Sequence, residues 1–208
     1  MASLYTFRYS NTVHKILPEK ENPVLRQTAK NLPISDIKSA RIRALISEMK
    51  KLLSVEKYGV ALAAPQVGEP IRLFIISGRA LARGKRNSPD AESDDDNESA
   101  QEKVEPPPPD LVYINPELLK ISRKKSEKHE GCLSVRGKWG VVPRAEKATV
   151  RAYDEHGIKF TRGASGFLAH IFQHELDHLE GVLYTDKATA VYAETEERPE
   201  GARKKIKT

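Results

Sequence analysis

The sequence SGFLAHIFQHELDHLEG, residues 165–181, contains the pattern H-E-x-x-H at His174, Glu175 and His178. On an α-helix, side chains four residues apart lie one above the other, so both imidazoles can reach one metal ion while the glutamate projects beside it. The pattern is typical of metal-dependent hydrolases. Ser165 is a suitable N-cap and Gly181 a suitable end for the helix. An apolar stripe on one face supports the helix, formed by Phe167, Leu168, Ile171 and Phe172.

The composition is that of a single globular domain. With 208 residues, of which 38% are apolar, the chain is long enough for one core and short for two. No apolar run approaches the length of a membrane span, and the first residues lack the apolar stretch and cleavage site of a secretory signal. The single cysteine, Cys132, cannot form an internal disulfide, which excludes an exported disulfide-stabilised scaffold. We therefore expect a soluble cytoplasmic protein of bacterial type without a membrane partner, and the short N-terminal extension leaves an organellar location open.

The net charge of +6 hides an uneven distribution along the chain. Residues 84–110 contain nine acidic and three basic side chains, so the rest of the chain carries 32 Lys and Arg against 20 Asp and Glu. A basic body attracts polyanions, of which RNA is the commonest in a cell, but a solvated basic face without a partner is equally common. Charge alone leaves both interpretations open, and the sequence gives no reason to expect a DNA partner.

Apolar periodicity and the positions of Gly and Pro predict the other elements. A core helix is expected over 36–58 and a buried strand over 71–76. The stretch 84–110 is polar, acidic and proline-ended, so we expect a disordered insertion within the one domain, 1–208, and a polar tail from about 190. Further strand-like runs lie at 111–122, 130–135, 141–142, 148–153 and 159–162.

A catalytic site of this kind usually needs a third protein ligand and an open position for water. Glu180 lies only two residues beyond His178 and is badly placed to reach the same ion. Cys132 is a candidate, although a lone buried cysteine is more often a small core residue. Gln66, in the run of small residues at 59–68, would by itself be interpreted as an exposed side chain in a tight turn. The residues alone leave the third ligand open.

Three segments together resemble peptide deformylase, because GVALAAPQVG at 59–68, EGCLS at 130–134 and HELDH at 174–178 are similar to the three motifs of that family, in the same order. The resemblance covers most of about 13–187, and its flanking matches are PEKENPVLRQTAK (18–30), INPELL (114–119), VVPRAEKATVRAYDEHG (141–157) and LEGVLY (179–184). It implies an α+β fold in which short mixed β-sheets wrap around a central helix that carries H-E-x-x-H. It also implies removal of the N-terminal formyl group from formyl-methionine of newly synthesised polypeptides.

The resemblance implies a role for each residue of the motifs. Cys132, His174 and His178 would bind one divalent metal ion, which is Fe²⁺ in most members, although Zn²⁺, Ni²⁺ and Co²⁺ also suit these ligands. Glu175 would take a proton from the attacking water and pass it to the departing amine.

Other residues are implied to support this chemistry. The side-chain amide of Gln66 and the backbone N–H of Leu133 would stabilise the tetrahedral oxyanion. An ion pair between Glu130 and Arg144 would hold the cysteine loop. The substrate backbone is implied to run along Gly59, Val60 and Ala61. The residues implied to line the methionine pocket are Val60, Leu133, Phe167, His170 and Ile171.

Three other functions stay open at this stage. A metallopeptidase or another amide hydrolase would use the same ligands. A homologue that binds metal and peptide with impaired catalysis is indicated by Ala61, where the family usually has glycine, and by His170, where it is usually aliphatic. A structural metal site would need His170 as a fourth ligand, but imidazoles at three successive turns span about 12 Å of helix, so we expect His170 not to be a ligand. The expected partners are N-formyl-methionyl nascent peptides, with a transient ribosome or rRNA contact through the basic surface.

Overall fold

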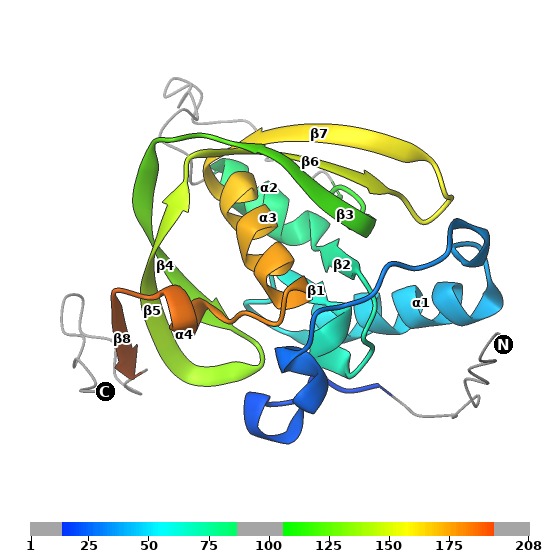
Figure 1. Ribbon diagram of the computed structural model, residues 1–208, viewed down its shortest axis with the longest axis horizontal. Coiled ribbons are helices and arrows are strands. Elements are labelled where there is room, and N and C mark those ends of the chain that lie inside the picture. Colours follow the sequence, from blue (N-terminus) through cyan, green and yellow to red (C-terminus); the bar gives the residue numbers. More distant parts are fainter. Residues whose placement is uncertain (1–13, 87–105, 194–208) are drawn as a thin grey trace, which may run out of the picture.

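The computed structural model describes residues 14–86 and 106–193, including side chains except at 83–86 (Figure 1). The helices, with 3₁₀ segments labelled η, are η1 Glu19–Glu21, η2 Pro23–Arg26, η3 Ile34–Asp36, α1 Ala40–Val55, η4 Ala64–Val67, α2 Gly78–Arg86, α3 Gly166–Leu179 and α4 Tyr184–Lys187. The strands are β1 Ala61–Ala63, β2 Leu73–Ile76, β3 Leu111–Ile121, β4 Lys125–Cys132, β5 Val135–Ala145, β6 Lys147–Tyr153, β7 Lys159–Ser165 and β8 Ala190–Ala193.

Two antiparallel sheets wrap around α3. The five-stranded sheet has the order β1-β2-β3-β6-β7, and the three-stranded sheet has the order β4-β5-β8. The β3–β6 ladder continues into the β4–β5 ladder through a bend, where the N–H of Ser122 donates to the carbonyl of Lys147 and that of Glu146 to the carbonyl of Lys124. Figure 1 shows the result, with α3 enclosed between the β6–β7 ribbon and the β4–β5 ribbon.

The core explains why the five-stranded sheet lies between two helices. Successive residues of a strand point to opposite faces, and β2 is apolar at every position. Leu73 and Ile75 pack in the cluster that includes the apolar face of α1, whereas Phe74 and Ile76 pack in the cluster that includes α3. The sheet therefore holds α3 along its length, and with it the H-E-x-x-H residues.

The structure refines the predicted boundaries. The first helix begins at Ala40, because the hydroxyl of Ser39 accepts a hydrogen bond from the N–H of Ile42 and caps it, while residues 34–36 form a separate 3₁₀ turn. Helix α2 was not predicted, and it includes 84–86 of the expected insertion. The rest of that insertion up to 105 lies outside the described residues, while 106–110 lead irregularly into β3. The tail expected from about 190 begins later, because Ala190–Ala193 form β8 and pair with β5, and the residues from 194 lie outside the described residues.

The helices of the described ranges, 14–86 and 106–193, do not meet the requirements of a membrane span. None of them is both long enough and apolar enough to cross a bilayer.

Candidate metal centre

Helix α3 positions the two histidines of the motif on one face. His174 and His178 are four residues apart, and their ring centroids lie 4.9 Å from each other. The helix begins after Ser165, which occupies the N-cap position without a capping side-chain hydrogen bond. It ends before Gly181, whose φ of 72° is the left-handed conformation that glycine adopts without strain.

Cys132 reaches the same point from the other side of the site. It is the last residue of β4, and the chain turns at 133–134 before β5 begins. Its Sγ lies 3.3 Å from Nε2 of His178. One ligand atom from each of Cys132, His174 and His178 lies within 4.8 Å of the other two, so the three can hold one ion. A thiolate and two imidazoles form a donor set that suits a divalent transition metal.

Glu175 is enclosed beside these ligands. Its side chain is 3% exposed, and Oε2 has no hydrogen-bond partner among the described residues. Burial raises the pKa of Glu175 to about 7, which places the carboxyl near the pH at which it can both accept and release a proton. Burial, followed by the nearby charge of His174, lowers the pKa of His178 well below its ordinary value and favours the neutral form that binds metal. A buried carboxylate oxygen for which residues 14–86 and 106–193 provide no partner, beside three convergent ligands, fits an ion and its water at this position.

Gln66 projects its amide group towards the thiol. Its Oε1 accepts a hydrogen bond from the N–H of Ala63 at 2.8 Å, which fixes the orientation of the amide. Its Nε2 donates to Sγ of Cys132 at 3.4 Å and to Oγ of Ser134 at 3.3 Å. The side chain is 2% exposed, so it is not the exposed turn residue that its position alone indicates. The amide is an N–H donor held at the edge of the candidate metal centre.

A buried ion pair supports the cysteine loop. Nε and Nη2 of Arg144 donate to Oε1 and Oε2 of Glu130 at 2.6 and 2.9 Å, and Nη1 donates to Asp177 at 2.6 Å. Nδ1 of His174 also donates to Oε2 of Glu130, at 2.7 Å. Because Nδ1 is engaged, Nε2 of His174 is the nitrogen left to bind an ion.

The residues expected to bind substrate lie around β1 and the start of α3. Strand β1 is at the edge of its sheet and pairs only with β2. Ala61 is 8% exposed and packs in the cluster that contains α3, as Ile171 does, with Val60 packed against it. Leu133 packs against the other cluster, and Phe167 is 41% exposed. Phe167 and Ile171 lie on α3 with two of the ligands, and Leu133 directly follows the third, whereas Val60 and Ala61 belong to the edge of the neighbouring sheet at β1.

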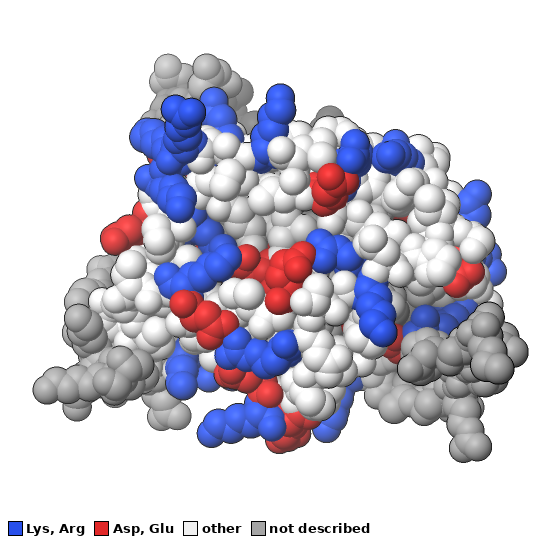
Figure 2. Space-filling model, in the orientation of Figure 1, with Lys and Arg blue, Asp and Glu red and all other residues white. Residues whose placement is uncertain are grey.

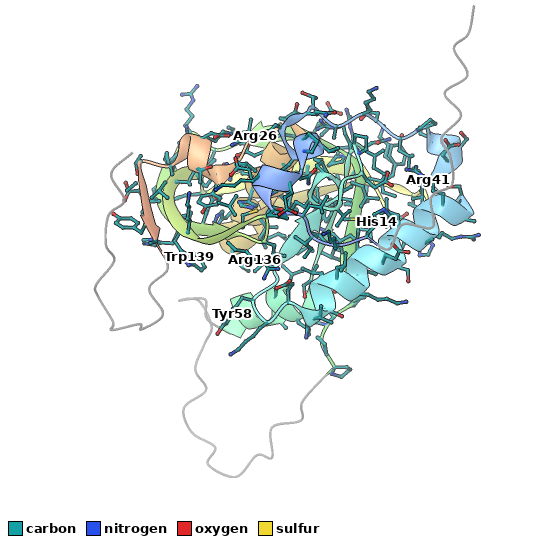
Figure 3. The ribbon with its side chains drawn as sticks, turned by 90° about the horizontal axis from the view of Figure 1, so that it is seen from below. His14, Arg26, Arg41, Tyr58, Arg136 and Trp139 are labelled. Carbon is teal, nitrogen blue, oxygen red and sulfur yellow. The ribbon has the colours of Figure 1, made fainter. Side chains whose placement is uncertain are left out.

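The surface beside the cysteine loop carries basic and aromatic side chains. Nη2 of Arg136, on β5, donates to Glu56 at 2.6 Å and thereby connects β5 to the segment before β1. A Cβ built on Gly131 would lie 3.2 Å from the ring of Trp139, so this ring packs directly on the backbone next to Cys132. Figure 3 shows Arg136 and Trp139 at the same end of the molecule, away from His14.

A family model described as "Polypeptide deformylase" matches residues 13–194. The chain belongs to the peptide deformylase family. "Peptide deformylase 1A, chloroplastic" of Solanum lycopersicum is 38% identical over 166 residues, which are 80% of this chain and 56% of the tomato protein. The peptide deformylase of Desulforudis audaxviator is 31% identical over 176 residues, which are 84% of this chain and 94% of that protein. The chain thus spans little more than half of the plant relative.

A solved structure of another peptide deformylase has a similar fold to this deformylase-family chain. The crystal structure of a peptide deformylase from Legionella pneumophila matches with a TM-score of 0.65 and 32% identity, over 86% of this chain and 87% of that chain. The predicted resemblance and the α+β fold around the H-E-x-x-H helix are confirmed.

The deformylase motifs meet at one place, but sequence reasoning missed two contacts there. The carboxylate of Asp177 lies inside HELDH and binds Arg144, and the imidazole of His170 lies 3.0 Å from Glu130. On α3, Asp177 lies three positions after His174 and His170 lies four positions before it. This spacing was a signal that both residues belong to the face of the ligands or to its border. His170 is not in the group of three ligands.

Proposed function

We propose that this chain is a metal-dependent peptide deformylase, formed as one catalytic domain, that removes the N-terminal formyl group from formyl-methionine of newly synthesised polypeptides. The observation that carries the proposal is the convergence of Cys132, His174 and His178 beside the buried carboxylate of Glu175, whose Oε2 has no hydrogen-bond partner in the described part of a chain of this family. The arrangement provides three protein ligands and one proton carrier, as amide hydrolysis at a metal requires.

The metal site would hold one divalent ion through a thiolate and two imidazoles. When bound, such an ion supplies a Lewis acid that polarises a carbonyl and lowers the pKa of water. We propose Fe²⁺ as the native ion because the family resemblance implies it, and the ligand set itself also accommodates Zn²⁺, Ni²⁺ and Co²⁺. Anaerobic purification followed by metal analysis identifies the ion.

The residues around the ligands would move the proton and stabilise charge. Glu175, buried beside the ligands, would accept the proton of the attacking water and deliver it to the amine that leaves. The orientation of the Gln66 amide is fixed by the bond that Oε1 accepts from Ala63, and Nε2 would donate to the oxyanion by exchanging its long contact with Sγ of Cys132 for the new acceptor. The backbone N–H of Leu133, in the turn after Cys132, would be the second donor.

The position of β1 at the edge of its sheet supports an extended peptide as substrate. An edge strand leaves backbone groups that an added strand can pair with, and alternate side chains of that strand then enter pockets. The peptide backbone would run along Gly59 to Ala61. Phe167 and Ile171, on the first turns of α3, would contact the methionine side chain together with Val60, Leu133 and His170.

A peptide assay on the metal-loaded protein tests this function. Formate release from formyl-Met-Ala-Ser is expected, while acetyl-Met-Ala-Ser should remain intact because its larger acyl group is not the substrate. A longer peptide with a blocked N-terminus should also remain uncut. Cleavage of internal peptide bonds, or no turnover of the formyl peptide by fully loaded protein, would contradict the proposal in favour of a peptidase or of a binding protein.

The partner we propose beyond the substrate is ribosomal RNA, contacted through the basic bend, which we define as Lys120, Arg123, Lys124, Lys125 and Lys147. All five residues are exposed, and the hydrogen bonds between the β3–β4 and β5–β6 connections bring them together. Figure 2 shows Lys and Arg side chains gathered at the upper left, over the bend between β3 and β4. Of the five, Lys124 forms an ion pair with Glu146 at 3.1 Å. A concentration of cations on a projecting bend attracts phosphate backbones.

Co-sedimentation with purified ribosomes over a range of salt concentrations tests the contact. Replacing Arg123, Lys124 and Lys125 by Ser should weaken binding to the ribosome. The slope of log K against log salt concentration should become shallower by roughly one unit for each phosphate that the variant no longer neutralises. The matched control replaces three exposed cations elsewhere, Lys38, Arg43 and Lys51, with the same change in net charge. Equal weakening in the two triple variants would mean that overall charge, and not the basic bend, attracts the ribosome.

A further inference from the structure

The carboxylate of Glu130 lies at the centre of the hydrogen bonds that surround the candidate metal site. It is 2% exposed, and each of its oxygens accepts one bond from Arg144. Oε2 accepts a second bond from Nδ1 of His174 at 2.7 Å. Oε1 has Nε2 of His170 at 3.0 Å. His170 therefore approaches one carboxylate oxygen within ion-pair distance, while the metal-site residue His174 is hydrogen-bonded to the other.

The plane of this carboxylate determines where His174 points. A ligating imidazole is held by the acceptor on its other nitrogen, which fixes both the tautomer and the orientation of the ring. Arg144 donates one hydrogen bond to each carboxylate oxygen of Glu130. Each oxygen can accept one more bond, and the two histidines lie at these positions. His170 and His174 are four residues apart on α3, and both rings reach the same carboxylate from one helix face.

An N–H donated by His170 would add a second donor to a buried acceptor, Oε1 of Glu130, from which Nε2 lies 3.0 Å away. Without it, Oε1 of Glu130 would keep a single bond from Arg144, in a position that water barely reaches. A buried carboxylate that loses one of its donors shifts towards those that remain. One of these is the N–H of His174, so the ring that must face the ion would be pulled out of position.

We propose that His170 is a positioning residue for the metal site, acting through Glu130 to fix the ring of His174 by donating its Nε2–H to Oε1. This inference rests on the metal site proposed above, and nothing in the motif pattern assigns this role to His170. It differs from a ligand, because His170 is not part of the group of three donors. It differs from a pocket role, because it depends on the N–H and not on the shape of the ring.

The test compares variants that keep or remove the donor. His170→Leu has a similar volume without an N–H, whereas His170→Gln keeps an amide N–H on a side chain of comparable reach. Affinity is measured with Co²⁺ or Ni²⁺ by competition with a chelator, because loss of an outer-shell partner typically weakens metal binding by about 10- to 100-fold. We expect His170→Leu to lose about tenfold in affinity, with a shift of the Co²⁺–thiolate absorption band, and His170→Gln to recover most of both.

A control histidine separates positioning from general stability. His14 also contacts glutamates, with Nδ1 2.5 Å from Glu48 and Nε2 3.3 Å from Glu69, and Figure 3 shows it beside α1 and far from Trp139 at the cysteine loop. His14→Leu should lower the melting temperature without changing metal affinity. If His170→Leu does not fold, His170→Ala is measured in its place.

Each outcome decides between the alternatives. Unchanged metal affinity and spectrum in the donor-free variant would overturn the role of His170 while leaving the wild-type metal site intact. Equal losses in His170→Leu and His170→Gln would overturn it as well, because the effect would then follow the ring and not the donor. A wild-type protein that binds no divalent ion would overturn the proposed function and this inference together.

Discussion

Arg144→Met should be among the most destabilising substitutions in this chain. The guanidinium is 3% exposed and donates to Glu130 twice and to Asp177 once. Its removal leaves the carboxylate of Glu130 buried without its main countercharge, which typically costs about 3 to 5 kcal/mol. For a domain of this size, each kcal/mol lowers the melting temperature by roughly 2 to 4 °C, so we expect a fall of about 6 to 20 °C at neutral pH.

The pH dependence of this loss has a definite sign. Burial alone would raise the pKa of Glu130, but hydrogen bonds from Arg144, His170 and His174 outweigh it and hold the pKa well below its ordinary value. A carboxyl with a lowered folded-state pKa stabilises the fold above its unfolded-state pKa, and this contribution is lost as the pH falls towards the folded-state value. The difference between wild type and Arg144→Met should therefore be largest near pH 7 and shrink below about pH 4.3, the ordinary value for glutamate.

Urea unfolding of the metal-free proteins at pH 7 and pH 4 measures both effects. The matched control is Arg151→Met, because Arg151 also contacts a glutamate, Glu117, at 2.6 Å, but the two side chains are 40% and 59% exposed. An exposed pair contributes about 0 to 1 kcal/mol, so the control should lose little. If Arg144→Met lost no more than Arg151→Met at pH 7, the reasoning about the buried pair would be refuted.

Two further substitutions test packing and catalysis. In thermal unfolding, Gly140→Ala should destabilise the fold by about 1 to 3 kcal/mol, because the added Cβ would lie 2.8 Å from the buried ring of Tyr184. The control Gly163→Ala should be nearly neutral, because the atom nearest to its added Cβ lies 3.8 Å away. Gln66→Leu should lower kcat by about 100- to 1000-fold while one ion per chain is retained, because it removes an oxyanion donor and no ligand. Retained turnover in that variant would assign the donor role elsewhere.

The sequence predicted the helix that carries the metal motif because a spacing of four residues is a local property of an α-helix. It could not place Cys132 from spacing, since the cysteine is 42 positions before His174 and meets it only after β5 to β7 have folded back. The family resemblance supplied that ligand. The contact between His170 and Glu130 was not predicted, because it depends on the rotamer of one side chain and on how closely β4 packs against α3.

Boundaries were predicted less well than the elements themselves. The first helix was expected to begin before Ser39, because apolar periodicity does not reveal which of several polar residues caps a helix. Helix α2 was missed because its end is polar and merges in sequence with the acidic stretch that follows. In the structure its first N–H, that of Gly78, donates to Asp110 at 2.9 Å, a contact across 32 residues that no local pattern indicates.

The most direct test measures metal content and formate release on the same anaerobic preparations of wild type, Glu175→Ala and Cys132→Ala. It separates the role of the ligands from the role of the proton carrier. We expect one ion per chain and formate release from formyl-Met-Ala-Ser in the wild type. Glu175→Ala, which loses the proton carrier, should keep one ion without turnover, and Cys132→Ala, which loses a ligand, should lose both. Metal loss in Glu175→Ala, or substantial formate release by Cys132→Ala, would contradict these roles.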